Sequence, residues 1–275
     1  MILELLEYCL TPCSWSARSL GFLKSSIQVR ARYNRCRDQW RGHLEKTREF
    51  VLSAARLASR RRTAVVFGAG LLHDIPLAEL SQMFEKVVLV DIVHTWPCRW
   101  RAIQFSNVEL LETDVTGVAA AIAAARRTPS RPLPVSRPME FVDDRAVDFA
   151  VSVNLLSQLP WVPGHFLGDS RSDEEISALK SQLIHAHLDY LRRLPGHTAL
   201  VTDATWSSVP CSVGDCRAVE VWDVLSGVAL PEPFQSWEWR IAPAPERSRE
   251  LNYVAHVQAY PDWKRAWGGD GVGRE

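Results

Sequence analysis

The sequence predicts an α/β protein with a doubly wound, mostly parallel sheet, a terminal antiparallel strand pair and an N-terminal helical extension. Short apolar runs, typical of strands buried on both faces, alternate with stretches of helical periodicity. Several runs end in Gly, Asp or Asn, so small and polar residues should gather at one edge of the sheet. Two later β-like runs, 236–241 and 251–260, flank a turn with two prolines, which predicts the antiparallel pair.

The composition indicates a globular protein with a large core. The chain has 275 residues, 47% of them hydrophobic, and its 32 basic residues balance its 32 acidic ones. This balance makes nucleic acid an improbable partner, and we interpret the basic cluster Arg30–Arg37 as a solvated helix face. No apolar run approaches the roughly 20 residues that a membrane span needs, so we expect no membrane partner.

The N-terminal residues and the cysteines favour a cytoplasmic location. Glu4 and Glu7 interrupt the first apolar residues and no basic stretch precedes them, so we expect no signal peptide. The six cysteines are scattered and lack zinc-site spacing, and the pair Cys211 and Cys216 has no companion His or Cys cluster. We therefore expect reduced thiols and no bound metal.

The chain divides into three parts. Residues 1–37 form an extension of short helical pieces broken at Pro12 and Gly21, with no recognisable chemistry. Residues 38–262 form the α/β domain, and residues 263–275 form a C-terminal tail.

Strands and helices alternate within the α/β domain. Strands are expected over the apolar runs 64–67, 87–90, 108–111, 147–153 and 198–201. Helices are expected over 38–62, 76–84, 98–105, 118–126 and 176–194. Pro, Gly, Ser and Arg residues predict loops over 128–138 and 160–173.

The residues that follow the first four strands predict a ligand site. Gly68 and Gly70 follow the first strand, where the missing side chains let a ligand approach the backbone. Asp91 follows the second strand, 21 positions after Gly70, where a carboxylate can accept both hydroxyl protons of a ribose. Asp114 and Asn154 follow the third and fourth strands. Their order along the chain predicts one site at the carboxyl edge of the sheet.

Four segments resemble the class I S-adenosylmethionine-dependent methyltransferases. The run VVFGAG is similar to the first motif of that family, VVLVDIV to its acidic second strand, VELLETDV to its third strand and VDFAVSVNLLSQL to its fourth motif. The resemblance covers roughly residues 38–262. It implies a Rossmann-like domain that binds S-adenosylmethionine.

The resemblance also implies which residues hold the cofactor. The loop Gly68–Gly70 would line the methionine moiety, Asp91 the ribose and Asp114 the adenine, while Asn154 would border the approach to the methyl group. The complete cofactor site implied in this way comprises Gly68, Ala69, Gly70, Asp74, Asp91, Ile92, Asp114, Val115 and Asn154.

The sequence departs from the family pattern at two positions. Val66 stands where an acidic residue is usual, and Leu72 replaces the third glycine of the loop. The contact to the methionine ammonium would then come from Asp74 or His73. Asp74 has an alternative role as a cap of the helix that begins near Pro76.

The acceptor site is less well marked. His43 lies on the helix before the first strand, Asp203 ends the fifth strand and Trp206 belongs to a group of late tryptophans, so we expect these three to contact the acceptor. Ordinary packing is the alternative role for each. In-line methyl transfer needs no fixed set of catalytic side chains, so no catalytic residue is predicted, and the acceptor is expected to be a small molecule.

Two other functions fit parts of the pattern. A glycine loop followed by an acid also suits a dehydrogenase that uses NAD, although His73 occupies the position of the third glycine in that fingerprint. A non-catalytic S-adenosylmethionine sensor or scaffold would keep Gly70 and Asp91 but lack any reactive group.

Overall fold

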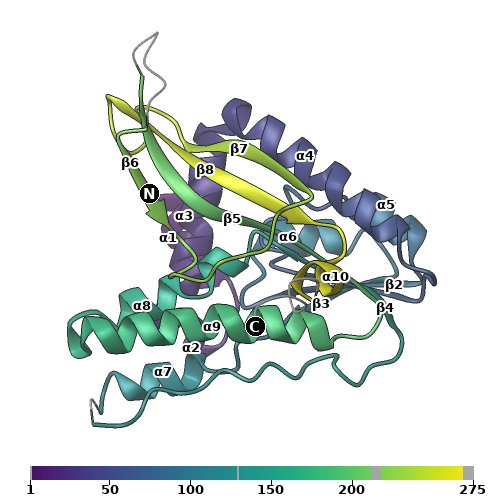
Figure 1. The fold of residues 1–275 in the computed structure, drawn as a ribbon, viewed down its shortest axis with the longest axis horizontal. Helices are drawn as coiled ribbons and strands as arrows, with labels where there is room; N and C mark the ends of the chain where they lie inside the picture. The colour runs from purple at the N-terminus through teal and green to yellow at the C-terminus, as the bar shows by residue number, and fades with distance from the viewer. Residues whose placement is uncertain (1, 129, 212–217, 269–275) are drawn as a thin grey trace, which may run out of the picture.

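The computed structural model describes residues 2–128, 130–211 and 218–268 and confirms the predicted fold class. The sheet has the strand order β3-β2-β1-β4-β5-β8-β7, with β6 paired to β5 (Figure 1). Its strands are β1 (Thr63–Phe67), β2 (Lys86–Asp91), β3 (Val108–Glu112), β4 (Val147–Val153), β5 (His197–Pro210), β6 (Glu220–Asp223), β7 (Gln235–Ala242) and β8 (Leu251–Tyr260). The first five strands run parallel, and β6, β7 and β8 are antiparallel to their neighbours.

Helices cover both faces of this sheet (Figure 1). One face carries α4 (Arg37–Arg56), α5 (Leu77–Met83) and α6 (Trp96–Ala102). The other carries α7 (Ala119–Ala125), α8 (Trp161–Leu167), α9 (Asp173–Arg193) and α10 (Trp263–Gly268). Val66 of β1 packs with the first group, whereas Val65 and Phe67 pack with the second. Burial on both faces explains why the strand is apolar from Ala64 to Phe67.

Two sheet predictions were incomplete. The fifth strand was predicted over 198–201, but β5 continues to Pro210. It pairs with β8 on both sides of a register shift between Asp203 and Thr205, and with β6 beyond that shift. Polar residues in this continuation hid it from an apolar pattern. The short strand β6 was not predicted, since most of its residues are exposed.

The loop predicted over 160–173 was wrong in part, because α8 occupies Trp161–Leu167. Pro163 lies in the first turn, where a backbone N–H has no partner within the helix and proline is tolerated. Gly164 faces the Lys180 side chain of α9, whose Cε would lie 2.3 Å from an added Cβ. The glycine thus leaves room for the Lys180 side chain.

The N-terminal extension is helical, as predicted. It consists of α1 (Ile2–Leu10), α2 (Trp15–Leu20) and α3 (Phe22–Arg35), and Gly21 joins the last two with a φ of 96°. The basic cluster in α3 is not simply solvated, because Arg30 pairs with Glu7 and Arg35 pairs with Glu246.

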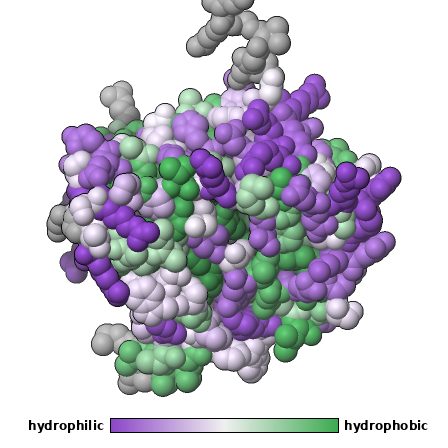
Figure 2. Space-filling model, turned by 90° about the horizontal axis from the view of Figure 1, so that it is seen from below, coloured by the Kyte–Doolittle hydropathy of each residue, from purple (hydrophilic) through white to green (hydrophobic). Residues whose placement is uncertain are grey.

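The surface mixes hydrophilic and hydrophobic residues on the face shown in Figure 2. Among the described residues, no helix is long and apolar enough to cross a membrane.

The residues after β8 are part of the core. Trp263 of α10 is fully buried, lies 5.3 Å from Tyr260 between ring centroids and donates to the backbone oxygen of Leu188 at 3.0 Å. The start of the predicted tail is therefore a helix packed against α9, while residues 269–275 lie outside the described part.

Trp263→Ala is expected to lower the free energy of unfolding by about 3–5 kcal/mol, because it removes a buried aromatic side chain and leaves a cavity. Urea unfolding followed by circular dichroism measures the loss. Trp100→Ala is the control, since Trp100 is 67% exposed, and should change the value by less than about 0.5 kcal/mol. Similar losses in both variants would contradict the role of Trp263.

Candidate functional site

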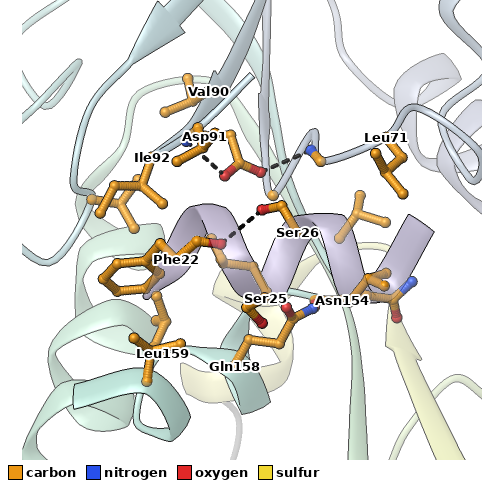
Figure 3. A pocket seen from close by; sticks show the side chains of 18 of the residues that line it. Phe22, Ser25, Ser26, Leu71, Val90, Asp91, Ile92, Asn154, Gln158 and Leu159 are labelled. Carbon is orange, nitrogen blue, oxygen red and sulfur yellow. Dashed lines mark hydrogen bonds between the residues drawn. The ribbon is translucent and has the colours of Figure 1, made fainter. Parts of the chain in front are cut away.

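A cavity opens at the carboxyl ends of β1 to β4, between the sheet and α3 (Figure 3). Most residues predicted for the cofactor or acceptor line it, namely His43, Gly68, Gly70, Asp74, Asp91, Ile92, Asp114, Val115 and Asn154. Ala69 is fully buried beside this lining. Asp203 and Trp206 do not belong to the lining.

The glycines after β1 have different tasks. A Cβ on Gly68 would lie 2.6 Å from the backbone oxygen of Val153, so this residue permits close contact between the loop and β4. Gly70 has a φ of 46°, and a Cβ there would meet only ordinary contacts. Leu72, at the third glycine position, has a φ of 59°. The chain thus adopts at Leu72 a conformation that favours glycine.

Asp91 connects the end of β2 to this loop. Its Oδ2 accepts from the backbone N–H of Gly70 at 2.8 Å, and its Oδ1 accepts from that of Val93 at 3.4 Å (Figure 3). Burial raises the pKa of Asp91, while these hydrogen bonds favour the ionised form. A carboxylate has about four lone-pair sites, so Asp91 retains capacity for hydroxyl donors in the cavity.

Asp114 shapes the turn before α7. Its Oδ1 accepts from the backbone N–H and the hydroxyl of Thr116 at 2.9 and 2.6 Å, and its Oδ2 accepts from the backbone N–H of Ala119 at 2.7 Å. Both oxygens thus hold the protein chain. The contact of Asp114 with adenine stays a prediction, and any such contact would share a carboxylate that already caps a helix.

Asn154, His43 and Asp74 form a polar group at the other end of the cavity. The Asn154 amide lies 2.8 Å from Asp74 Oδ2 and 3.2 Å from His43 Nε2. Trp237 Nε1 donates to His43 Nδ1 at 3.1 Å, and the imidazole stacks on Trp239 with centroids 4.0 Å apart. Burial lowers the pKa of His43 to about 3 and raises that of Asp74. His43 is therefore neutral near pH 7.

Helix α3 forms the side of the cavity opposite the sheet, although its sequence had not indicated a role in a ligand site. Phe22, Ser25, Ser26 and Val29 line the cavity, and Figure 3 shows the helix crossing it opposite Asp91. These residues share one helical face through their spacing of three and four positions. Half of them are serines, so the face lacks the hydrophobic pattern that would have marked it.

The two other predicted acceptor contacts form a separate group. Asp203 accepts from the hydroxyl of Ser157 and from Trp206 Nε1, which connects β5 to the short helix η1 (Leu156–Gln158). Burial raises the pKa of Asp203. The structure thus gives Asp203 and Trp206 contacts within the fold but does not bring them to the cavity.

The ionisable side chains in the described lining of the cavity are acids and histidines. Asp74, Asp91 and Asp114 contribute carboxyl groups, and none of the described lining residues is Lys or Arg. Arg48 and Arg101 approach from outside the lining and donate to the backbone oxygens of the loop after β1. Within the described ranges, no cluster of three or more His, Cys, Asp or Glu could hold a metal ion.

Comparison with known proteins finds similarity in solved structures alone. No family model and no curated protein matches the chain. One similar structure is 1,6-didemethyltoxoflavin-N1-methyltransferase from Burkholderia thailandensis, with bound 1,6-didemethyltoxoflavin and S-adenosylhomocysteine. It has 16% identity and a TM-score of 0.35, over 91% of this chain and 92% of that one.

Two further similar structures are also complexes with S-adenosylhomocysteine. The N-methyltransferase NodS from Bradyrhizobium japonicum has 11% identity and a TM-score of 0.35, over 79% of this chain and 87% of that one. The DhpI complex has 12% identity and a TM-score of 0.37, over 86% of this chain and 95% of that one. The chain is thus similar, at low identity, to S-adenosylmethionine-dependent methyltransferases of known structure.

Alanine substitutions should separate the two glycines. Gly70→Ala should cost about 1–2 kcal/mol of unfolding free energy, because alanine is strained at positive φ. Gly68→Ala should lower the unfolding free energy by about 1–3 kcal/mol more, because its Cβ would also overlap with the backbone oxygen of Val153. Guanidinium unfolding of both variants measures the difference. Equal losses would show that Gly68 makes no critical close contact.

Proposed function

We propose that this protein is a cytoplasmic S-adenosylmethionine-dependent methyltransferase that acts on a small-molecule acceptor. In this proposal residues 38–262 form the catalytic domain and residues 1–37 supply its helical cover. The five cysteines in the described part of the chain are free thiols, as expected in a reducing compartment.

The observation that carries the proposal is the charge of the cavity. Its described lining has carboxyl groups at the ends of β2 and β3, from Asp91 and Asp114, a further one from Asp74 in the segment after β1, and no Lys or Arg. S-adenosylmethionine bears a sulfonium and an ammonium group, which this surface attracts. The two phosphates of NAD would instead lie among acids without a cationic partner, and nothing in the cavity favours the dehydrogenase.

The residues present fit the cofactor. Asp91 retains acceptor capacity for the hydroxyl groups of a ribose. Gly70 leaves space beside the Asp91 carboxylate, because an added Cβ would lie 3.9 Å from Asp91 Oδ2. Ile92 and Val115 offer apolar contacts next to the two acids. The described site is therefore compatible with an adenosyl group.

Transfer in this site depends on positioning. S-adenosylmethionine, when bound, supplies an electrophilic methyl group. The strand ends hold the adenosyl part, α3 covers the cavity and limits water, and His43 with Asn154 borders the end where an acceptor would approach. Fixed in-line geometry can supply several kcal/mol of the barrier reduction, roughly 7–11 kcal/mol in well-oriented systems. A proton released by the acceptor would pass to solvent or to a neighbouring basic group.

Thermal unfolding in the presence of candidate ligands tests the proposal. A ligand at about a hundredfold excess over its dissociation constant stabilises the fold by about 2.7 kcal/mol. We expect S-adenosylmethionine and S-adenosylhomocysteine to raise the melting temperature and NAD to leave it unchanged. Stabilisation by NAD alone, or by none of the three, would reject the assignment. Binding without methyl transfer to any acceptor would favour the sensor or scaffold.

Asp91→Ala should weaken S-adenosylhomocysteine binding about 10- to 100-fold, because it removes a charged hydrogen-bond acceptor. Part of this loss would come from the loop, since the Gly70 N–H also loses its partner. Isothermal titration calorimetry measures the affinity. Asp189→Ala, at an exposed position of α9, is the matched control. Unchanged affinity in Asp91→Ala would remove the ribose assignment.

Affinity for S-adenosylhomocysteine should also fall on acidification. Ribose hydroxyls donate to the ionised form of Asp91, and burial raises the pKa of this carboxyl above its ordinary value of 3.8. As the pH falls through that raised pKa, the fraction of protein with an ionised Asp91 decreases, and binding weakens with it. Titrations between neutral and acidic pH should show weakening before ordinary carboxylates titrate. An affinity that stays constant down to the ordinary carboxylate range would contradict the ionised acceptor.

A further inference from the structure

The direction of hydrogen bonding at the His43 end is set by Trp237. An indole N–H can only donate, so His43 Nδ1 accepts at 3.1 Å. A neutral imidazole carries one proton, which must then lie on Nε2. This N–H faces the Asn154 amide at 3.2 Å. The end of the amide that meets His43 must therefore be an acceptor.

The amide oxygen of Asn154 satisfies this requirement, and its nitrogen then lies at the opposite end. Nitrogen at the His43 end would place two donors against each other, and amide oxygen and nitrogen have nearly the same shape. Asp74 Oδ2 lies 2.8 Å from the same amide atom, so this orientation requires Asp74 to carry a proton and donate it to the amide oxygen. Burial raises the pKa of Asp74, with Arg48 and the Asn154 contact acting in the opposite sense. The other amide atom of Asn154 is buried and has no partner among the described residues, and in this orientation that atom is the nitrogen.

Trp239 supplies a second donor beside the same imidazole. It stacks on His43, lines the cavity and is only 9% exposed, yet its Nε1 has no hydrogen-bond partner among the described residues. Asn154 is 7% exposed and also lines the cavity. Two buried N–H groups therefore flank His43 without an acceptor. Buried donors without partners are rare in folded proteins and indicate a missing ligand or water.

We propose that the methyl acceptor is an uncharged molecule that offers a carbonyl oxygen, or a comparable lone pair, to Asn154 Nδ2 and Trp239 Nε1. This inference rests on the proposed function for the identity of the ligand as an acceptor. A carboxylate or phosphate would lie near Asp91 and Asp114 without a Lys or Arg partner among the described lining residues. A cation is disfavoured at this end because the nearest carboxyl, Asp74, is protonated. A neutral Asp74 would be a weaker partner for the cofactor ammonium than a carboxylate.

Trp237 is a positioning residue in this arrangement. It does not line the cavity, but its N–H determines the protonated nitrogen of His43 and, through it, the orientation of Asn154. Without that N–H, the imidazole can place its proton on Nδ1 and the amide can turn. The cavity would then present an oxygen in place of the Asn154 donor.

Indole NMR with three matched probes tests the inference. Protein labelled with ¹⁵N at its indoles and saturated with S-adenosylhomocysteine is titrated with 2-pyridone, picolinate and 2-(aminomethyl)pyridine, which are uncharged, anionic and cationic. We expect 2-pyridone alone to shift the Trp239 N–H resonance, which Trp239→Phe identifies. The resonance of Trp222, on β6 and outside the lining, should stay in place. Equal shifts with picolinate or the amine, or no shift with 2-pyridone, would overturn the inference.

Variants test the role of Trp237. Trp237→Phe should weaken 2-pyridone binding by about tenfold, as expected when a buried hydrogen bond is lost, whereas Trp222→Phe should not change it. Circular dichroism establishes that both variants fold. Unchanged binding in Trp237→Phe would overturn the assigned direction. A separate calorimetric titration of wild-type protein with S-adenosylhomocysteine distinguishes the two proposals: absent binding rejects the cofactor, while binding without a 2-pyridone response rejects only the acceptor class.

Discussion

The hydrogen bond between Asp91 and Gly70 is the contact on which the candidate site depends. It connects the end of β2 to the loop after β1, next to the point between β1 and β4 where the strand order changes direction. The adjoining Gly68 brings the same loop against Val153 at the end of β4. Three strand ends are thereby held together, and the cavity they border has a fixed backbone floor with one carboxylate still able to accept.

The polar groups at the opposite end come from elements that are distant along the chain. His43 belongs to α4, Asn154 follows β4, and Trp237 and Trp239 lie on the same face of β7. Because β7 joins the sheet through β8, the antiparallel strands bring tryptophans to a helix that precedes the first strand. The local chemistry is neutral, with a stacked imidazole and buried N–H groups, in contrast to the acidic end at β2 and β3.

Helix α3, which covers the cavity, is held in place by contacts with segments from distant parts of the chain. Helix α3 lies across the strand ends, while Arg35 at its C-terminal end pairs with Glu246 in the turn between β7 and β8. Exposed ion pairs contribute little to stability, about 0–1 kcal/mol. The burial of Leu23 and Ile27, two residues of α3, against Val93 after β2 contributes more to its position. The extension is thus part of the site in spite of its separate place in the sequence.

Local patterns in the sequence determined the parallel strands, the polar residues that follow them and most of the strand-end side of the cavity. A strand buried on both faces must be apolar throughout, and Gly68, Gly70, Asp91 and Asn154 stand directly after such runs, so proximity along the chain was sufficient. Only the tertiary structure decided that α3 covers the cavity, that His43 meets Asn154, and that Asp203 and Trp206 lie elsewhere. These contacts join residues on separate elements, and their side chains carry no periodic signal that indicates which partner they will meet.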